Sequence, residues 1–414
     1  MKTQIGMQFE GKVIAPLEGI RVLDLTHVVA GPYCTVLLAD AGAEVIKIER
    51  PGAGEMARSL GPFVTNARGE KASGTFLRLS RNKKGFSLDL RKAEGKKIFK
   101  ELVKIADVVV ENFVPGVMER LELGYPMLKE TNPRIIYASI SGFGHVDIYP
   151  GPYVDRPSFN MIAQAMGGLM EITGEADGPP FDCGASVGDI FPGVLTAFGI
   201  LLALRIRETT GFGQHIDTSM YDAMISLNER AILNYYLTGV IPTRGKEALL
   251  MPHGAFRTND GYVAIAVFTH EQWLGLCRAM GRDDLAADPS LKTGIERAQR
   301  AAFLRPIIEE WTSQKGKNEV TKILLAEGTP AGPVQNARDI IECPQAQARN
   351  MIVEINDPVA GKIKLAGNPL KLSMVAEPPL NPPPMLGEHT EELLSGLLGM
   401  TSAEIERLSA EGVV

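Results

Sequence analysis

The strongest structural signal in the chain lies in residues 19–50, GIRVLDLTHVVAGPYCTVLLADAGAEVIKIER. A short, largely apolar run at 20–25 predicts a strand, and Pro32 suits the first turn of the helix that follows it. Gly42 provides a natural stop for that helix, and the run at 44–49 predicts a second strand. Strand, helix and strand in this order predict a parallel βαβ unit.

The same alternation continues along the chain. Strands are expected at 107–111, 134–140 and 215–218, and a helix is expected at 93–105 before the first of them. A strongly apolar helix is expected from about 193 to 208. Alternating strands and helices predict an α/β fold with a Rossmann-like, doubly wound parallel sheet.

The pattern changes after residue 240. The run FRTNDGYVAIAV at 256–267 contains the Asp-Gly signature of a hairpin, and helical patterns follow it. This predicts a smaller α+β domain inserted into a large discontinuous domain. We expect the first part of the large domain at 1–215, a linker helix at 216–240 and the small domain at 241–339. The chain then returns to the large domain at 340–414, with a proline-rich strap (377–384) and two closing helices.

The chain has 414 residues, with 43 Lys and Arg against 49 Asp and Glu, which gives a formal net charge of −6. This charge excludes a generic basic surface for nucleic acid or for an anionic membrane. A ligand that carries phosphate must therefore be held by a local cluster of arginine and lysine. The longest apolar stretch, 193–204, is shorter than the roughly 20 residues of a membrane span, so a buried helix is expected there.

The four cysteines and six histidines are scattered along the chain. They show no C-x-x-C pair and no metal-ligand spacing, so neither a zinc site nor a disulfide framework is favoured. The first residues lack the continuous apolar region of a signal peptide. These features predict a cytoplasmic protein without a bound metal.

Polar or cationic residues follow the expected strands, and ligands of open parallel sheets bind outside the carboxyl ends of the strands. The residues at these ends are Thr26-His27, Arg50, Asn112-Phe113 and Ser141-Gly142. They either form one ligand site or are ordinary solvated loop residues, and the pattern leaves both interpretations open. The chain contains neither a Gly-rich dinucleotide fingerprint nor a P-loop motif, which disfavours a nicotinamide enzyme or a P-loop NTPase.

Residues 184–188, GASVG, match the G-x-S-x-G pattern in which α/β-hydrolases place their serine nucleophile. The preceding residues, GPPFDC at 178–183, do not make the buried strand that this elbow requires, so the case for Ser186 is weak. Asp189 stands at the start of the apolar helix. It is either an N-cap that accepts backbone N–H bonds, or a carboxylate held in a confined pocket as a nucleophile.

Several segments, in order and at consistent spacing, resemble the class III (CaiB/BaiF-type) CoA-transferase family, the group of formyl-CoA transferase and carnitine CoA-transferase. The similarity spans about residues 16–408. Its main segments are PLEGIRVLDLTHVVAGPYCT (16–35), GAEVIKIERPGAG (42–54), NKKGFSLDLR (82–91), ADVVVENFVPGVMERLELG (106–124), NPRIIYASISGFG (132–144), GASVGD (184–189), TGFGQHIDTSMYDA (210–223), GTPAGPV (328–334) and LGEHTEELL (386–394).

The resemblance implies CoA transfer between an acyl-CoA and a carboxylic acid, with Asp189 as the nucleophile. Transfer would pass through an aspartyl anhydride and an aspartyl-CoA thioester. The expected donor is succinyl-CoA or a similar acyl-CoA, the acceptor a mono- or dicarboxylic acid, and transfer within one acid is also open. The alternatives are an acyl-CoA hydrolase or isomerase that uses Ser186 or Asp189, and a CoA-binding subunit without catalytic activity.

The resemblance also implies which residues bind coenzyme A, which would be a substrate rather than a tightly bound cofactor. The matching positions are His27, Val29, Ala30, Arg50, Leu88, Arg91, Asn112, Phe113, Val114 and Arg120. Arg50, Arg91 and Arg120 would supply the local cation cluster that a negatively charged chain needs. Phe113 would offer an apolar face to adenine. No metal is expected.

An interlocked homodimer is expected from the resemblance, and a heteromer with a related subunit is open. Formyl-CoA transferase has glutamine where this chain has Val29, which weakens the case for a one-carbon substrate. The family's glycine-rich lid is not recognisable in 244–256, where His253 is a candidate contact for the acid. The related racemases use a His-Asp pair where this chain has Phe159 and Asn160, which argues against racemisation.

Overall fold

The computed structural model describes residues 15–145, 148–245, 250–375, 377 and 380–414. The chain folds into two compact units. The larger unit holds the described residues up to Gly174 together with Pro179–Pro242 and Asn350–Val414. The smaller unit holds Glu175–Gly178 and Thr243–Arg349. Part of the expected proline strap at 377–384 lies outside the described residues.

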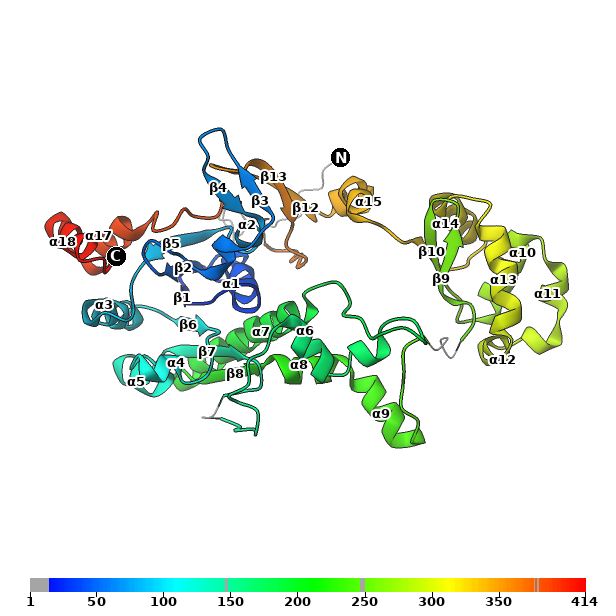
Figure 1. Ribbon diagram of the computed structural model, residues 1–414, viewed down its shortest axis with the longest axis horizontal. Coiled ribbons are helices and arrows are strands. Elements are labelled where there is room, and N and C mark those ends of the chain that lie inside the picture. Colours follow the sequence, from blue (N-terminus) through cyan, green and yellow to red (C-terminus); the bar gives the residue numbers. More distant parts are fainter. Residues whose placement is uncertain (1–14, 146–147, 246–249, 376, 378–379) are drawn as a thin grey trace. The chain divides into compact units, whose positions relative to one another are not determined.

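A six-stranded sheet forms the centre of the larger unit, and every pair of neighbouring strands in it is parallel (Figure 1). In spatial order the strands are β5 (Lys83–Ser87), β2 (Glu44–Glu49), β1 (Arg21–Asp24), β6 (Val108–Glu111), β7 (Ile136–Ser141) and β8 (His215–Ser219). The chain enters at the middle of the sheet, builds one half outward and then returns to build the other. This order is that of a Rossmann fold, so the expected doubly wound parallel sheet is confirmed.

Helices cover both faces of the sheet, each over its own apolar core. The core of one face includes residues of α1 (Ala30–Asp40), α6 (Asn160–Met166), α7 (Val187–Thr210) and α8 (Met220–Leu227). The core of the other includes residues of α3 (Ala93–Lys104), α5 (Tyr125–Thr131), α17 (Thr390–Leu398) and α18 (Ser402–Ala410). Each fully buried Leu, Ile or Phe in these cores contributes about 1.5–3 kcal/mol.

Strand β5 is absent from the sequence prediction because KKGFS does not look like a buried strand. Its Lys83 is nevertheless buried, and the ammonium lies 3.0 Å from the Asp24 carboxylate. The C-terminal segment covers the outer edge of β5, where the His389 amide donates to the Gly85 carbonyl at 2.9 Å. A Cβ on Gly85 would stand 2.8 Å from the Met385 carbonyl, so glycine is required here. An otherwise open sheet edge is thereby protected.

Helix α7 begins at Val187, several residues earlier than the sequence predicts. Gly188 and Pro192 suggest a helix break, but a Cβ on Gly188 would stand 2.6 Å from the Asn160 carbonyl. The glycine therefore marks a close approach between α6 and α7 and not a stop. Within the described residues, α7 is the one helix long and apolar enough to cross a membrane by length and composition, and 44% of its most apolar window is buried inside the chain.

The strand expected at 215–218 is confirmed as β8, but the linker helix expected within residues 216–240 is not one helix. Two helices follow β8, α8 and α9 (Glu229–Thr238). The break falls at Asn228, whose side-chain amide donates to the Gly167 carbonyl at 3.1 Å. An asparagine that bonds to a neighbouring backbone competes with the helix for hydrogen bonds, which explains the interruption.

In the smaller unit, β9 (His253–Thr258) and β10 (Gly261–Ala266) form the expected hairpin, and β11 (Ala331–Pro333) joins β10 antiparallel. Its core includes Trp273. The buried Arg297 donates to the carbonyls of Met251 and Leu291. The helices here are α10 (His270–Met280), α11 (Asp283–Ala287), η3 (Pro289–Leu291), α12 (Gly294–Gln299), α13 (Ala301–Thr312), α14 (Lys317–Ala326), α15 (Ala337–Glu342) and α16 (Pro344–Ala348).

The remaining elements lie in the larger unit. They are η1 (Met56–Ser59), β3 (Phe63–Thr65), β4 (Lys71–Ser73), α2 (Gly74–Leu77), α4 (Val117–Arg120), η2 (Met170–Ile172), β12 (Ile352–Asp357) and β13 (Gly361–Ala366). The strands among them form two separate antiparallel pairs, β3 with β4 and β12 with β13.

Candidate active site

The loop between β1 and α1 contacts the loop after β6 at the carboxyl end of the sheet. The His27 amide donates to Asn112 Oδ1 at 2.7 Å, and Asn112 Nδ2 donates back to the His27 carbonyl at 2.9 Å. The rings of His27 and Phe113 lie 5.2 Å apart. Two of the four strand ends that the sequence singles out are therefore in direct contact.

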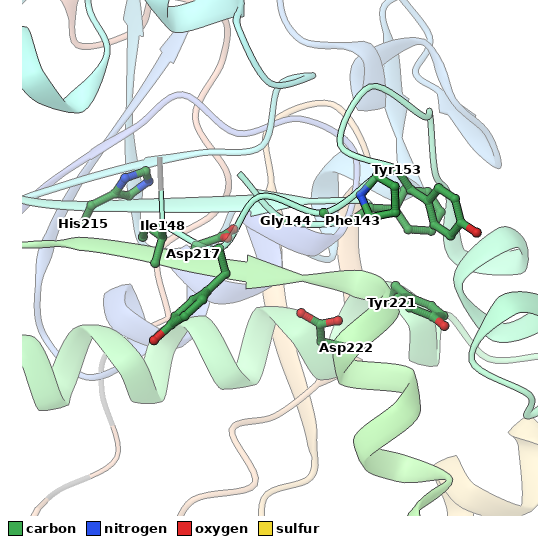
Figure 2. Close-up of a pocket in the computed structure, with 11 residues that line it drawn as sticks. Phe143, Gly144, Ile148, Tyr153, His215, Asp217, Tyr221 and Asp222 are labelled. Carbon is green, nitrogen blue, oxygen red and sulfur yellow. The ribbon is translucent and has the colours of Figure 1, made fainter. Parts of the chain in front are cut away.

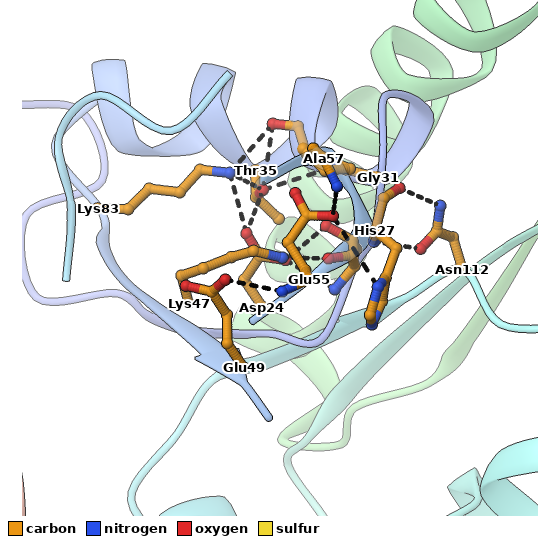
Figure 3. A network of polar contacts seen from close by, with 12 residues as sticks. Asp24, His27, Gly31, Thr35, Lys47, Glu49, Glu55, Ala57, Lys83 and Asn112 are labelled. Carbon is orange, nitrogen blue, oxygen red and sulfur yellow. Dashed lines mark hydrogen bonds and ion pairs between the residues drawn. The ribbon is translucent and has the colours of Figure 1, made fainter. Parts of the chain in front are cut away.

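A buried ionic network contacts the β1–α1 loop on its buried side (Figure 3). Asp24 accepts from the Thr35 hydroxyl at 2.7 Å and from Lys83 Nζ at 3.0 Å. Lys47 Nζ lies 3.5 Å from Asp24 Oδ1 and donates to the Thr26 carbonyl. Burial alone would raise the pKa of Asp24, but the two ammonium groups and the hydroxyls lower it far below its usual range.

This network is outside the sequence prediction. Its only sequence signal is a lysine inside each of two strands, β2 and β5. Both lysine side chains are fully buried, and burial lowers the pKa of Lys83. Burial, together with the charge of Lys47, also lowers the pKa of His27 to about 4. The His27 imidazole is therefore neutral at pH 7.

Val28, between His27 and the start of α1, has a backbone φ of 65°. A β-branched residue in this left-handed region is strained by about 1–3 kcal/mol, and such strain persists only where neighbouring contacts hold it. The Val28 amide donates to Glu55 Oε2 at 3.1 Å. The expected contact residues Val29 and Ala30 follow directly and are buried, Val29 as the N-cap and Ala30 as the first residue of α1.

Asp189 is the third residue of α7, and Ser186 is the N-cap. The interpretation of Asp189 as the N-cap is therefore wrong. Its carboxyl is largely buried, and burial raises its pKa to about 6, while the charge of Arg78 opposes that rise. One helical turn later, a Cβ on Gly193 would stand 2.5 Å from the Ala30 carbonyl. Residues four apart share a helix face, so Asp189 lies on the side of α7 that packs against α1.

Ser186 does not have the setting of a hydrolase nucleophile. The described residues between Ile172 and Ser186 contain no strand, so the strand-to-helix elbow of the G-x-S-x-G motif is absent from this part of the chain. The motif reflects a helix start after a glycine turn.

Arg50 and Arg91 both act on Asp89, which follows β5. Arg91 forms a two-point contact with the Asp89 carboxylate, with Nε 2.8 Å from Oδ1. Hydrogen bonding from Arg91 and the charge of Arg50 are among the causes that hold the pKa of Asp89 at about 2. Both arginines are exposed, and the Arg91 guanidinium is already paired with the Asp89 carboxylate.

A hollow of about 430 Å³ lies beside Arg91 on the first turns of α3. It is lined by three lysines that the sequence prediction misses, Lys96, Lys97 and Lys100, together with Glu101 and Glu122. Helix α3 follows the carboxyl end of β5, so this cationic hollow lies at the same edge of the sheet as the loops described above.

The remaining residues expected to bind CoA differ in how much of the side chain is exposed. Leu88 is buried in the core under α3, so only its backbone is available to a ligand. Val114 is 56% exposed, and Arg120 is an exposed residue at the end of α4. The buried Glu111 accepts from the Phe113 amide at 2.8 Å, and burial raises its pKa to about 7. Glu111 is a further residue that the sequence prediction misses.

A second hollow, of about 410 Å³, opens between the loop after β7, β8 and the start of α8 (Figure 2). Five ring side chains and two carboxylates line it; they are Phe143, Tyr149, Tyr153, His215, Tyr221, Asp217 and Asp222. Burial raises the pKa of Asp217. In the described part of the chain, no group of three or more His, Cys, Asp or Glu side chains has the arrangement of a metal site.

Comparison with known proteins identifies the family. The family model of CoA-transferase family III matches residues 17–390. A succinyl-CoA:mesaconate CoA-transferase of Haloarcula hispanica is 46% identical over 381 residues, which cover 91% of this chain and 95% of the relative. A succinyl-CoA:glutarate CoA-transferase of Mus musculus is 35% identical over 401 residues, which cover 96% of this chain and 90% of the relative.

A solved structure agrees with these matches. The crystal structure of a CaiB/BaiF family protein from Brucella suis superimposes with a TM-score of 0.83 at 34% identity, over 92% of this chain and 99% of that chain. The resemblance drawn from the sequence motifs is confirmed. The chain belongs to CoA-transferase family III and is a CoA-transferase.

Proposed function

We propose that this enzyme transfers CoA from succinyl-CoA, or a similar acyl-CoA, to a dicarboxylic acid by way of Asp189. The carboxylate of Asp189 in the first turn of α7 carries this proposal. It is largely buried, its pKa is raised to about 6, and it lies on the side that packs against α1. A carboxylate of raised pKa is still mostly ionised at pH 7 and is a stronger nucleophile than a solvated one. The succinyl-CoA relatives support the choice of donor.

The proposed reaction is a sequence of acyl transfers. A carboxylate oxygen of Asp189 attacks the thioester carbonyl, the C–S bond breaks, and an aspartyl anhydride and CoA thiolate form. The thiolate attacks the aspartyl carbonyl, which releases the donor acid and leaves an aspartyl-CoA thioester. The acceptor carboxylate repeats both steps in reverse and leaves with CoA. One thioester is exchanged for another, so the overall reaction is close to isoenergetic.

The larger unit is the proposed CoA-binding domain. The loop from His27 to Ala30 and the contact pair Asn112 and Phe113 would line the part of CoA near the thioester and the adenine. Arg50 and Arg91, whose charges both lower the pKa of Asp89, would meet the phosphates of CoA. CoA enters and leaves as a substrate.

The proposed assembly is a homodimer in the cytoplasm. Large apolar side chains stay exposed on α7 and α9; they are Val194, Phe198, Leu201, Leu202, Ile206, Ile232, Leu233, Tyr235, Tyr236 and Leu237. An apolar surface of this extent favours a protein interface, and a second copy of the chain is the proposed partner. Light scattering would show one species of twice the chain mass, and a monomer at micromolar concentration would overturn this assignment.

Trapping the covalent intermediate tests the proposed function. The enzyme is mixed with succinyl-CoA and then with hydroxylamine or borohydride, and the modified peptide is located by mass spectrometry. Modification at Asp189 is expected. Modification at Ser186, or at neither residue, would overturn the mechanism.

Exchange of labelled succinate into succinyl-CoA gives a second test. The substitution Asp189→Ala is expected to abolish this exchange, while Ser186→Ala, at the N-cap of the same helix, serves as the matched control and retains it. Exchange that survives in Asp189→Ala would refute the role of this residue. The acceptor acid is then found by screening dicarboxylates for new CoA esters by mass spectrometry.

A further inference from the structure

Val28, in the loop between β1 and α1, has a backbone conformation that is unfavourable for a β-branched residue. Its φ of 65° belongs to the left-handed region that glycine adopts readily and valine does not. Backbone strain of this kind clusters at functional sites, where the surrounding structure holds it. Val28 lies between two parts of the proposed site, His27 on one side and the start of α1 on the other.

A single buried carboxylate holds the Val28 peptide. Glu55 is 2% exposed, and its Oε2 accepts from the amides of Val28 at 3.1 Å and of Ala57 at 2.7 Å. Glu55 is itself fixed, because its amide donates to Glu49 Oε2 at 3.0 Å. Arg58 in turn holds the Glu49 carboxylate through two hydrogen bonds of 2.7 Å. The position of the Glu55 oxygen is therefore set by the segment that follows β2.

The backbone on both sides of Val28 has contacts of its own, although the His27 imidazole Nδ1 also lies 3.9 Å from Glu55 Oε2. Asn112 holds His27 through its amide and its carbonyl. On the other side, the Ala30 carbonyl packs against Gly193 of α7. Val28 thus joins these two parts, and the direction of its peptide decides how the short loop between His27 and α1 faces the substrate.

We propose that Glu55 is a positioning residue for CoA transfer, which acts by holding Val28 in its left-handed conformation. This inference rests on the proposed function. The carboxylate does not touch the substrate. It orients the loop along which the thioester lies, so that the acyl carbonyl meets the nucleophile on α7. Removing Glu55 releases the strain at Val28 and turns the loop, and a misplacement of about 1 Å costs up to about 100-fold in rate.

Kinetics of Glu55 variants test the proposal. Glu55→Ala is expected to lower kcat about 10- to 100-fold and to change KM for the acyl-CoA less than about threefold. Glu55→Gln keeps an oxygen that accepts from both amides, so its loss stays below about threefold. Glu55→Asp is too short to reach both amides and behaves like Glu55→Ala, which keeps the test valid where the alanine variant does not fold. Glu70→Ala, on the β3–β4 hairpin, is the matched control with unchanged kinetics.

A double-mutant cycle with Val28 identifies the route of the effect. Glycine at position 28 adopts the same φ without strain, so Glu55→Ala is expected to cost several-fold less in a Val28→Gly background than in the wild-type chain. An equal loss in both backgrounds would overturn the proposal, as would a wild-type kcat in Glu55→Ala. The same assay on Asp189→Ala distinguishes a failure of the proposed function from a failure of the positioning role of Glu55. If that variant retains exchange, the proposed function fails; if it loses exchange while Glu55→Ala does not, only the positioning role fails.

Discussion

Gly193 of α7 lies so close to Ala30 of α1 that a Cβ at position 193 would stand 2.5 Å from the Ala30 carbonyl oxygen. The backbones of the two helices therefore meet where α1 leaves the loop of the candidate site. Because Asp189 is one turn before Gly193 on α7, this contact sets the position of the carboxylate relative to that loop. The contact between Gly193 and Ala30 therefore affects where the proposed nucleophile lies.

The first prediction concerns this contact. Gly193→Ala places a methyl group against backbone that cannot move aside as a flexible side chain can, so α1 and α7 must separate. The expected cost is about 1–3 kcal/mol in the free energy of unfolding, together with a loss of exchange activity. Urea denaturation and the exchange assay measure both.

Gly396 in α17 is the control for this substitution, since its Cβ would meet nothing within 4 Å. Gly396→Ala is expected to be neutral or to stabilise the chain by up to about 1 kcal/mol through helix propensity. Equal effects at the two glycines would contradict the packing argument.

The pH dependence of transfer is the second prediction. Because the Asp189 carboxylate must be ionised to attack and its pKa is about 6, kcat/KM is expected to rise with pH through this value and then level off. Arg78 lowers the pKa of Asp189, so Arg78→Ala should move the rising limb to higher pH, and Arg78→Lys should move it less. A pH–rate profile of the three proteins provides the measurement. A limb that shifts to lower pH in Arg78→Ala would exclude this assignment.

The third prediction is that the Asp189 carboxylate, although needed for activity, lowers the stability of the folded chain. Its pKa rises from 3.8, the value of an unperturbed aspartate, to about 6 in the folded chain, so the folded state favours the protonated form. The resulting penalty is absent below pH 3.8, grows as pH rises, and is complete above about 6. Asp189→Asn is therefore expected to be inactive but more stable than wild type by about 1–3 kcal/mol at pH 7.

Denaturation curves at several pH values measure this difference. The gain of Asp189→Asn should shrink toward pH 4. Asp182→Asn, in the loop before α7, is the control and should change stability by less than about 0.5 kcal/mol. A destabilised Asp189→Asn at pH 7 would show that the carboxylate is better accommodated than its burial indicates.

The sheet could largely be predicted from the sequence because most of its strands are apolar runs at regular spacing. Strand β5 could not, since its lysine and glycine have partners that are distant in sequence, Asp24 and the C-terminal segment. The early start of α7 escapes prediction for a similar reason. A glycine that marks close packing and a glycine that ends a helix look the same in one sequence.

The same limit applies to the candidate site. The pairing of His27 with Asn112 follows from a topological rule, because parallel strands bring their carboxyl ends to one edge. Glu55 and the two buried lysines carry no comparable signal. Their partners are backbone groups, one buried aspartate, the Thr35 hydroxyl and the His27 imidazole, which lie elsewhere in the sequence. Charged residues in a sequence are by default assigned to the surface.

The last prediction concerns the buried pair of lysines. Asp24→Asn preserves the shape of the side chain but removes the negative charge that lies 3.0 Å from Lys83 and 3.5 Å from Lys47. Breaking a buried ion pair on one side leaves uncompensated charge, so the expected loss is about 3–5 kcal/mol at pH 7. The exposed Asp284, paired with Arg282 at 2.6 Å, provides the control, and Asp284→Asn should cost less than about 1 kcal/mol.

The stability difference between wild type and Asp24→Asn should also depend on pH. Because the pKa of Asp24 is lowered on folding, its contribution is complete above the unperturbed value of 3.8 and is lost as pH falls. The gap between wild type and Asp24→Asn should therefore narrow in acid. A gap that stays constant as the pH falls would mean that the aspartate acts through its hydrogen bonds to Thr26 and Thr35 and not through its charge.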